Sequence, residues 1–245
     1  MITSLKRTFR RLAIPFSQDY NRVRILQTIV SKKKAKTYLE IGVDQGKVFE
    51  IIHGPTKVGV DPVAPAKKVK AVLGPRTKYF QKTSDDFFEQ DAKSEFKEKI
   101  DVAFIDGLHE YKQVLKDINN TLEYLADDGV IIVHDCSPWT KAAAIRAFSF
   151  AEAKEIADRD QYKDWDGGWT GDVWKAIGEL KSTRGDLEVF VLDCDCGLGV
   201  IRKGIQKLIN LENIENMEYE DLVKNKEGIL NLKKPEYFED FLETL

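Results

Sequence analysis

Acidic side chains and histidines recur at the points where the predicted strands end. The residues at these points are Glu40 with Gly42, Asp61, Ser84 with Asp85, Asp106 with His109, and His134 with Asp135. In an open α/β sheet the ligand lies outside the carboxyl ends of the strands, so we expect these side chains to share one cleft. Carboxylates and imidazoles in a cleft can bind a cation, accept hydrogen bonds from hydroxyls, or move a proton.

The first of these strand ends carries an acid and two glycines. Glu40 is followed by Gly42, and Gly46 comes four positions later. Glycine permits a tight turn and a close approach of the backbone to a ligand. A carboxylate here would repel a pyrophosphate but suits a cofactor with a cationic amino acid and a ribose, which favours S-adenosylmethionine. The NAD motif Gly-x-Gly-x-x-Gly is not met, because Asp44 and Lys47 replace its second and third glycines.

The next two strand ends offer further groups for a nucleoside. Asp61 follows Glu40 by 21 residues, where an acid can accept hydrogen bonds from ribose hydroxyls. The alternative for Asp61 is a helix N-cap. Ser84 and Asp85 could reach an adenine, and they could equally cap the helix that follows.

The last two strand ends combine acids with histidines. Asp106 and Asp135 end neighbouring strands and could share Mg²⁺, Mn²⁺ or Ca²⁺, which prefer oxygen ligands. His109 and His134 have the pKa of a general base near neutral pH. The alternatives are a helix-start histidine bonded to a local carboxylate for His109 and a satisfied, half-buried histidine for His134.

Alternating apolar and amphipathic segments predict the elements that position these groups. Runs of Val, Ile, Leu and Phe between helices are typical of a parallel sheet covered on both faces. We predict an α/β fold with a doubly wound, mostly parallel, Rossmann-like seven-stranded sheet, a terminal antiparallel hairpin and one reversed edge. The expected strands are 37–42, 57–60, 78–81, 102–105, 130–133, 188–192 and 199–202; the expected helices are 20–31, 46–53, 84–98, 111–126 and 140–157.

The chain divides into three predicted parts. Residues 1–19 form a basic arm, which is either a solvated terminus or a weak anchor to anionic lipid or a partner. Residues 20–204 form the main domain, with an inserted loop at 137–172 that is either a mobile cover for substrate or a surface loop. Residues 205–245 are predicted to be a helical appendage, suited to a C-terminal subdomain or a homo-oligomer contact.

Composition excludes several classes of protein. The 245-residue chain has a net charge of −3, which argues against a nucleic-acid binder. The sequence shows neither an apolar run of membrane-span length nor a secretory signal, so we expect no transmembrane segment. Three cysteines form no disulfide or zinc framework, and reduced thiols in a cytoplasmic protein are expected.

Taken together, these motifs resemble those of class I S-adenosylmethionine-dependent methyltransferases. The chain is most similar to a bacterial branch associated with glycans and secondary metabolites. The matching stretches are 38–46, Asp61, 104–111, 129–135 and 171–176.

The resemblance implies a role for each strand-end residue. It implies that Glu40, Gly42 and Gly46 surround the methionine part of the cofactor, that Asp61 binds its ribose, and that Ser84, Asp85 and Asp106 complete the cofactor site. In metal-using relatives, among them catechol and macrolide-sugar O-methyltransferases, aspartates placed like Asp106 and Asp135 hold Mg²⁺. Such enzymes often supply an Asn or a second acid next, where this chain has Cys136.

The implied activity is O-methylation of a sugar, a glycan or another small hydroxylated molecule, assisted by a divalent metal in some relatives. The sulfonium methyl is already activated, so the protein must align an acceptor hydroxyl and remove its proton. The catalytic candidates are His109, His134 and Asp135. Two alternatives stay open: a catalytically silent binding protein with the cofactor fold, and a metal-dependent hydroxylase-like relative.

Overall fold

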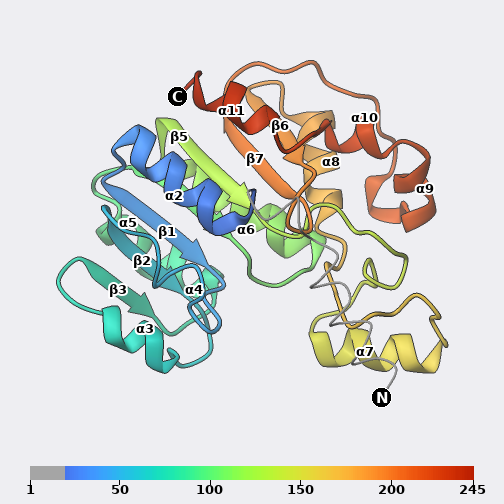
Figure 1. Cartoon of the computed structure of the whole chain (residues 1–245), viewed down its shortest axis with the longest axis horizontal. Coiled ribbons are helices and arrows are strands. Elements are labelled where there is room, and N and C mark those ends of the chain that lie inside the picture. The colour runs from blue at the N-terminus through green and yellow to red at the C-terminus, as the bar shows by residue number, and fades with distance from the viewer. Residues whose placement is uncertain (1–19) are drawn as a thin grey trace.

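An eight-stranded sheet runs through the molecule in the order β3-β2-β1-β4-β5-β7-β6-β8 (Figure 1). The computed structural model describes residues 20–245, so the predicted basic arm at 1–19 lies outside the described residues. The α/β, mostly parallel fold with a C-terminal hairpin is confirmed. The strands are β1 Thr37–Ile41, β2 Thr56–Val60, β3 Thr77–Phe80, β4 Ile100–Ile105, β5 Leu125–Val133, β6 Leu187–Leu192, β7 Leu198–Lys203 and β8 Leu232–Lys233.

The sheet changes its winding direction between β1 and β4. Strand β1 pairs in parallel with β2 on one side and with β4 on the other, so that Leu39 lies between Val58 and Ala103. The connections that leave these strands therefore diverge and open a crevice at their carboxyl ends. Glu40, Asp61 and Asp106 all lie near this edge of the sheet.

The hairpin differs from the prediction in two respects. Strand β7 runs antiparallel to both β5 and β6, so the reversed strand lies inside the sheet rather than at its edge. An eighth strand, β8, pairs in parallel with β6. Residues 232–233 of the predicted appendage therefore extend the sheet.

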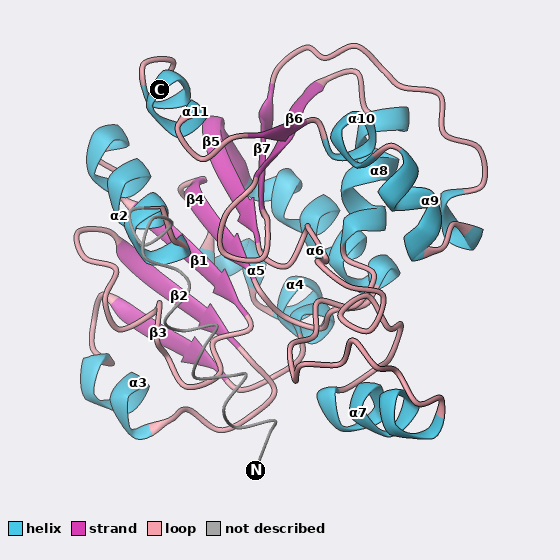
Figure 2. Cartoon of the chain, turned by 45° about the vertical axis from the view of Figure 1, so that its right-hand side comes forward, coloured by secondary structure: helices cyan, strands magenta, loops and turns pink. Residues whose placement is uncertain are grey.

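Helices cover both faces of the sheet (Figure 2). Adjacent β1 residues point to opposite faces, so Leu39 packs into one core with α4, α6 and α8, while Tyr38 packs into the other with α2, α3 and α11. The helices are α2 Arg22–Lys33, α3 Lys67–Val72, α4 Ser84–Gln90, α5 Ala92–Glu95, α6 Tyr111–Tyr124, α7 Phe150–Arg159, α8 Trp174–Thr183, α9 Tyr219–Lys224, α10 Lys226–Leu230 and α11 Tyr237–Leu242.

Three predicted helices differ from the structure by more than a shift of two residues at their ends. The segment 46–53 forms hydrogen-bonded turns instead of a helix, starting at Gly46 with φ of +73° and followed by Gly54 with φ of +115°. The segment 84–98 divides into α4 and α5 at Asp91. The helix expected at 140–157 begins at Phe150, because the Ser149 side chain accepts a hydrogen bond from the backbone N–H of Glu152 and caps it.

The insertion at 137–172 builds a small layer of its own beside the sheet. Helix α7 packs Ala153 and Ala157 against Ala142 and Ile145, and Figure 1 shows this helix away from the central strands. Within residues 20–245, every helix is too short or too polar to span a bilayer.

Candidate active site

Two cavities open at the carboxyl ends of the strands. The Asp61 cavity has a volume of about 490 Å³ and is lined by Asp61, Ser84, Asp85 and Gln113, among others. The His134 cavity, about 800 Å³, is lined among others by Arg22, Glu40, His109, His134, Asp135, Trp169, Asp195 and Cys196. Both include Gly42, Asp44, Asp106 and Gly107 in their walls. One elongated ligand could therefore extend through both.

Glycine is required after β1, where the backbone passes close to the loop that follows β4. Gly42 has φ of +83°, and a Cβ there would lie 2.1 Å from the backbone oxygen of Asp106. Gly46, with φ of +73°, would place a Cβ 2.4 Å from Cγ2 of Val69, and it lines neither cavity. Gly42 therefore joins the two cavities, whereas the contact of Gly46 is with helix α3.

Asp61 is held rigidly by backbone donors. Its Oδ2 accepts a hydrogen bond from the N–H of Asp44 at 2.9 Å, and its Oδ1 accepts one from the N–H of Val63 at 2.8 Å. Each carboxylate oxygen can accept more than one hydrogen bond. Asp61 can thus still accept hydroxyl donors from a ligand in its cavity.

Helices α4 and α6 complete the Asp61 cavity. Thr83, not Ser84, caps α4, since its hydroxyl accepts from the N–H of Asp86. Ser84 and Asp85 instead meet the side-chain amide of Gln113, whose Nε2 lies 3.3 Å from Ser84 Oγ and 3.1 Å from Asp85 Oδ1.

Gln113 also bonds a buried acid that the sequence analysis did not single out. Its Nε2 lies 3.1 Å from Oδ1 of Asp117, one helical turn further along α6. Burial raises the pKa of Asp117 to about 6. Gln113 and Asp117 are four residues apart, so they lie on the same face of the predicted helix. This spacing is the sequence signal that could have identified the pair.

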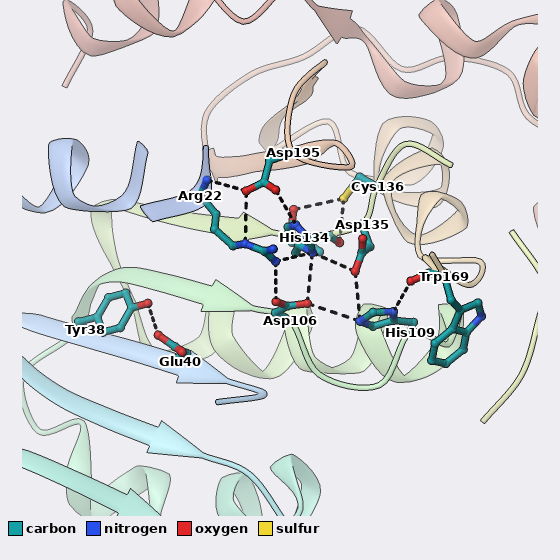
Figure 3. A network of polar contacts seen from close by, with 11 residues as sticks. Arg22, Tyr38, Glu40, Asp106, His109, His134, Asp135, Cys136, Trp169 and Asp195 are labelled. Atoms are coloured by element: carbon teal, nitrogen blue, oxygen red, sulfur yellow. Dashed lines mark hydrogen bonds and ion pairs between the residues drawn. The ribbon is translucent and has the colours of Figure 1, made fainter. Parts of the chain in front are cut away.

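Glu40 is buried beneath the His134 cavity. The hydroxyl of Tyr38 donates to its Oε2 at 2.6 Å, and Figure 3 shows this pair to one side of the histidine cluster. Burial raises the pKa of Glu40 to about 8. Burial thus favours the protonated form of this carboxyl group.

Four predicted residues from two strand ends do come together. Nε2 of His109 lies 3.5 Å from Asp106 Oδ1 and 3.2 Å from Asp135 Oδ2. Nδ1 of His134 lies 3.3 Å and 2.9 Å from the same two oxygens (Figure 3). The prediction that these side chains share one cleft is supported by these distances.

Charge pairing outweighs burial within this cluster. Burial alone would raise the pKa of Asp106, but contacts with His134 and His109 hold it well below its usual value. Burial would lower the pKa of His134, but the carboxylates of Asp135 and Asp106 raise it well above the usual value. The pKa of His109 is raised for the same reason, despite its burial.

Two residues that the sequence analysis missed extend the cluster. Arg22, the first residue of α2, places Nη1 3.2 Å from Asp106 Oδ2 and Nε 3.3 Å from Asp195 Oδ2. The backbone N–H of Arg22 also donates to Asp195 Oδ2 at 2.8 Å. Arg22 and Asp195 are far apart in the sequence, so no local pattern predicts their contact; the fold brings them together.

Strained backbone positions border the same cluster. Asp135, Asp195 and Cys196 have φ angles of 61°, 45° and 65°, a left-handed conformation that costs free energy for residues other than glycine and is frequent at functional sites. The hairpin carrying Asp195 is held to the chain after β5, since the N–H of Cys136 donates to Gly197 O at 3.0 Å.

Cys136 follows Asp135 at the position where the resemblance implies an oxygen ligand. Its thiol is buried and lies 3.4 Å from the carbonyl oxygen of Val133. Burial raises its pKa to about 12, so it stays a neutral thiol. Asp106, His134 and Asp135 remain as potential ligands, with ligand atoms all within 4.8 Å of one another.

The insertion supplies an aromatic wall above His109. The rings of Trp169 and His109 are 4.9 Å apart and inclined by 31°, and Nδ1 of His109 lies 3.3 Å from the carbonyl oxygen of Trp169. Trp139 and Phe150 line the same cavity. The segment 137–172 thus forms part of the cavity wall.

The stretch 171–176 fixes the loop that carries His109. Gly171 packs so closely that a Cβ would lie 1.8 Å from the carbonyl oxygen of His109. Asp172 accepts a hydrogen bond from the N–H of Tyr111 at 2.7 Å, at the first turn of α6. This pair therefore positions His109 from a distant part of the chain.

Comparisons with known proteins found a family model and solved structures that resemble this chain. Residues 39–136 match a family model described as a methyltransferase domain. An O-methyltransferase from Bacillus cereus, solved with S-adenosylhomocysteine, has 17% identity and a TM-score of 0.52, covering 83% of this chain and 89% of that one. The methyltransferase PaMTH1 from Podospora anserina, also bound to S-adenosylhomocysteine, has 14% identity and a TM-score of 0.50, covering 82% and 87%.

A search of curated proteins gave no match. At these identities the solved structures establish the fold alone. Residues 39–136 are therefore similar to a methyltransferase domain, and the chain has a Rossmann-like methyltransferase fold. Arg22, Asp195, Cys196 and the whole insertion lie outside the matched segment.

Proposed function

We propose that this protein is an S-adenosylmethionine-dependent methyltransferase that methylates a hydroxyl of a small acceptor, either a sugar unit or another hydroxylated molecule. One observation carries the proposal: the Asp61 and His134 cavities meet at Gly42 and Asp106. A nucleoside in the first cavity would direct a reactive centre toward the acids and histidines of the second. The methyltransferase-domain match of residues 39–136 supports this assignment.

The Asp61 cavity has the groups that an adenosine requires. Ribose hydroxyls would donate to the carboxylate of Asp61, and Ser84, Asp85 and Gln113 would face the base. The ammonium group of the methionine part would lie near Glu40 and lower its pKa, because an opposite charge favours the ionised carboxylate. The sulfonium would then lie beside the backbone of Gly42 and Asp106.

We assign the role of base to His109 rather than His134. The side chain of His109 is 19% exposed and that of His134 is 5% exposed, so His109 is the more accessible to an acceptor. Nε2 of His109 would take the hydroxyl proton, and Asp135, 3.2 Å from that nitrogen, would stabilise the imidazolium. The nearby sulfonium would lower the raised pKa of His109 and favour the neutral base.

A divalent metal is compatible with the acids in this cluster. Asp106 and Asp135 would hold Mg²⁺, with His134 within reach, since the three ligand atoms lie within 4.8 Å of one another. When bound, the metal would lower the pKa of the acceptor hydroxyl. Arg22, which pairs with Asp106, would keep that carboxylate oriented.

Alignment is the remaining requirement for methyl transfer. Correct orientation of two reactants can supply about 7–11 kcal/mol in favourable systems. Trp139, Phe150 and Trp169 would contact the apolar faces of the acceptor, and His109 would contact its hydroxyl. These aromatic side chains suit a sugar or an aromatic ring.

The proposal is tested by combining calorimetry with a transfer assay. The purified protein should bind S-adenosylmethionine and S-adenosylhomocysteine, and should form S-adenosylhomocysteine when sugars or phenols are added. Failure to bind either nucleoside would overturn the proposal. Binding without transfer to any hydroxylated acceptor would favour a silent binding protein, and iron-dependent oxygen consumption would favour the hydroxylase alternative.

A further inference from the structure

The β6–β7 hairpin brings two potential metal ligands to the face of His134 that methyl transfer does not require. Nδ1 of His134 faces Asp106 and Asp135, whereas its Nε2 faces Asp195. Ligand atoms of His134, Asp195 and Cys196 all lie within 4.8 Å of one another. This trio shares only His134 with the acids proposed to hold Mg²⁺.

Nε2 of His134 is buried and, within residues 20–245, has no hydrogen-bond partner. The side chain is 5% exposed, and the nearest acid oxygen, Oδ1 of Asp195, is 3.7 Å away. That separation is too long for a hydrogen bond. Nε2 of His134 is therefore a buried ring nitrogen that faces a carboxylate without a hydrogen bond to it.

A metal ion would satisfy both atoms at this separation. Zinc binds histidine nitrogen at about 2.0–2.1 Å and carboxylate oxygen at about 2.0–2.2 Å, so a tetrahedral site holds the two atoms about 3.4 Å apart. The observed 3.7 Å is close to this value. The thiol of Cys196 would release its proton to solvent on binding the metal and provide a third ligand.

Neighbouring groups already orient two of the ligands. Oδ2 of Asp195 accepts from the backbone N–H of Arg22 at 2.8 Å and lies 3.3 Å from its Nε, which leaves Oδ1 free. Nδ1 of His134 lies 2.9 Å from Asp135 Oδ2. A carboxylate on the second nitrogen of a ligating histidine is usual at metal sites.

We propose that Nε2 of His134, Oδ1 of Asp195 and Sγ of Cys196 bind a divalent transition metal, with Zn²⁺ the best match. A nitrogen, an oxygen and a sulfur donor favour zinc over Mg²⁺ or Ca²⁺, which prefer oxygen alone. All three ligands line the His134 cavity, so a fourth position is open to water or a ligand.

Cobalt, which absorbs light where zinc does not, is the probe for this site. The full-length protein, first dialysed against a chelator, is titrated with Co²⁺ and followed by absorption. We expect one equivalent to produce a thiolate-to-cobalt charge-transfer band in the near ultraviolet, and Zn²⁺ to remove it. Absence of the band from the wild-type protein would overturn the proposal.

Variants separate this site from its neighbours. Cys196→Ser should abolish the band and weaken Zn²⁺ binding by about tenfold or more, whereas the matched variant Cys194→Ser, in the same hairpin, should retain both. Asp135→Asn should retain the band but weaken Co²⁺ binding, because it removes the carboxylate beside Nδ1 of His134 and no ligand atom; this distinguishes the site from the proposed Mg²⁺ site, where Asp135 is itself a ligand. A band that persists in Cys196→Ser would contradict the assignment.

A second variant tests the site if Cys196→Ser does not fold. If Cys196→Ser loses cooperative thermal unfolding, Asp195→Asn keeps the thiol and removes one ligand. Its Co²⁺ affinity should fall by about tenfold; an unchanged affinity would contradict the proposal. These readouts do not depend on methyl transfer, so the metal site and the proposed function can fail independently.

Discussion

The two cavities differ in how the chain builds them. Most of the Asp61 cavity comes from strand ends and the helices that follow them, and Asp61 itself is held by N–H groups of Asp44 and Val63. The His134 cavity gathers residues from Arg22 to Cys196 and includes left-handed backbone at Asp135 and Asp195. Local turns are sufficient to form a cavity for a ligand. A dense cluster of charges requires contacts between distant parts of the chain.

The cavities also differ in electrostatics. In the Asp61 cavity, burial raises the pKa of Asp117 to about 6, and its neighbours are mainly neutral hydrogen-bond donors. In the His134 cavity, paired opposite charges override burial at Asp106 and His134. We therefore expect substitutions in the first cavity to change cofactor affinity or stability, and substitutions in the second to change turnover.

The largest expected effect is on turnover, from His109→Ala. Loss of a general base typically lowers the rate by about 10²–10⁴-fold. The affinity for S-adenosylhomocysteine, which lacks the sulfonium charge, should stay within a factor of about two because His109 lies outside the Asp61 cavity. Steady-state kinetics and calorimetry measure the two quantities. The control is His53→Ala, which alters an exposed histidine. Equal losses of turnover in both variants would contradict the assignment of turnover to the His134 cavity.

The next effect concerns stability and pH, from Asp117→Asn. The pKa of Asp117 rises from 3.8 to about 6 on folding, so the native state binds the proton more strongly and stability falls as pH rises from about 4 to 6. Two pKa units correspond to about 3 kcal/mol. Denaturant unfolding at pH 4 and pH 7 should show this loss in the wild-type protein and not in the variant; parallel pH profiles would contradict it.

A smaller effect is expected on cofactor affinity, from Asp61→Ala. Hydrogen bonds to a charged group contribute about 1.5–3 kcal/mol, which corresponds to a roughly 10–100-fold weaker binding of S-adenosylhomocysteine. Calorimetry tests this, with Asp186→Ala as the control because Asp186 is an exposed acid paired with Arg184. Unchanged affinity in Asp61→Ala would remove the ribose assignment.

The smallest effect is expected from Trp169→Leu in the acceptor wall. An aromatic pair contributes about 0.5–1.5 kcal/mol beyond its buried area, so we expect KM for the acceptor to rise by about tenfold or less. Cofactor affinity should not change. A fall in cofactor affinity with an unaltered acceptor KM would contradict the assignment of Trp169 to acceptor binding.

Much of the fold and half of the site follow from sequence patterns. Continuous apolar runs in β1, β4 and β5 require burial on both faces, and parallel strands bring their carboxyl ends to one edge. Those two rules locate Asp61, Asp106 and Asp135 without any knowledge of distant contacts. They also predict that His109 and His134 lie close to the same acids.

Tertiary structure decided the rest. No local pattern connects Arg22 with Asp195, or Gly171 with His109, because their contacts depend on how separate layers pack. Backbone hydrogen bonding likewise held 46–53 as turns and β7 inside the sheet. The periodicity of apolar residues shows which face of a segment is buried. The partner of a charged side chain depends on which distant segments lie beside it in the folded protein.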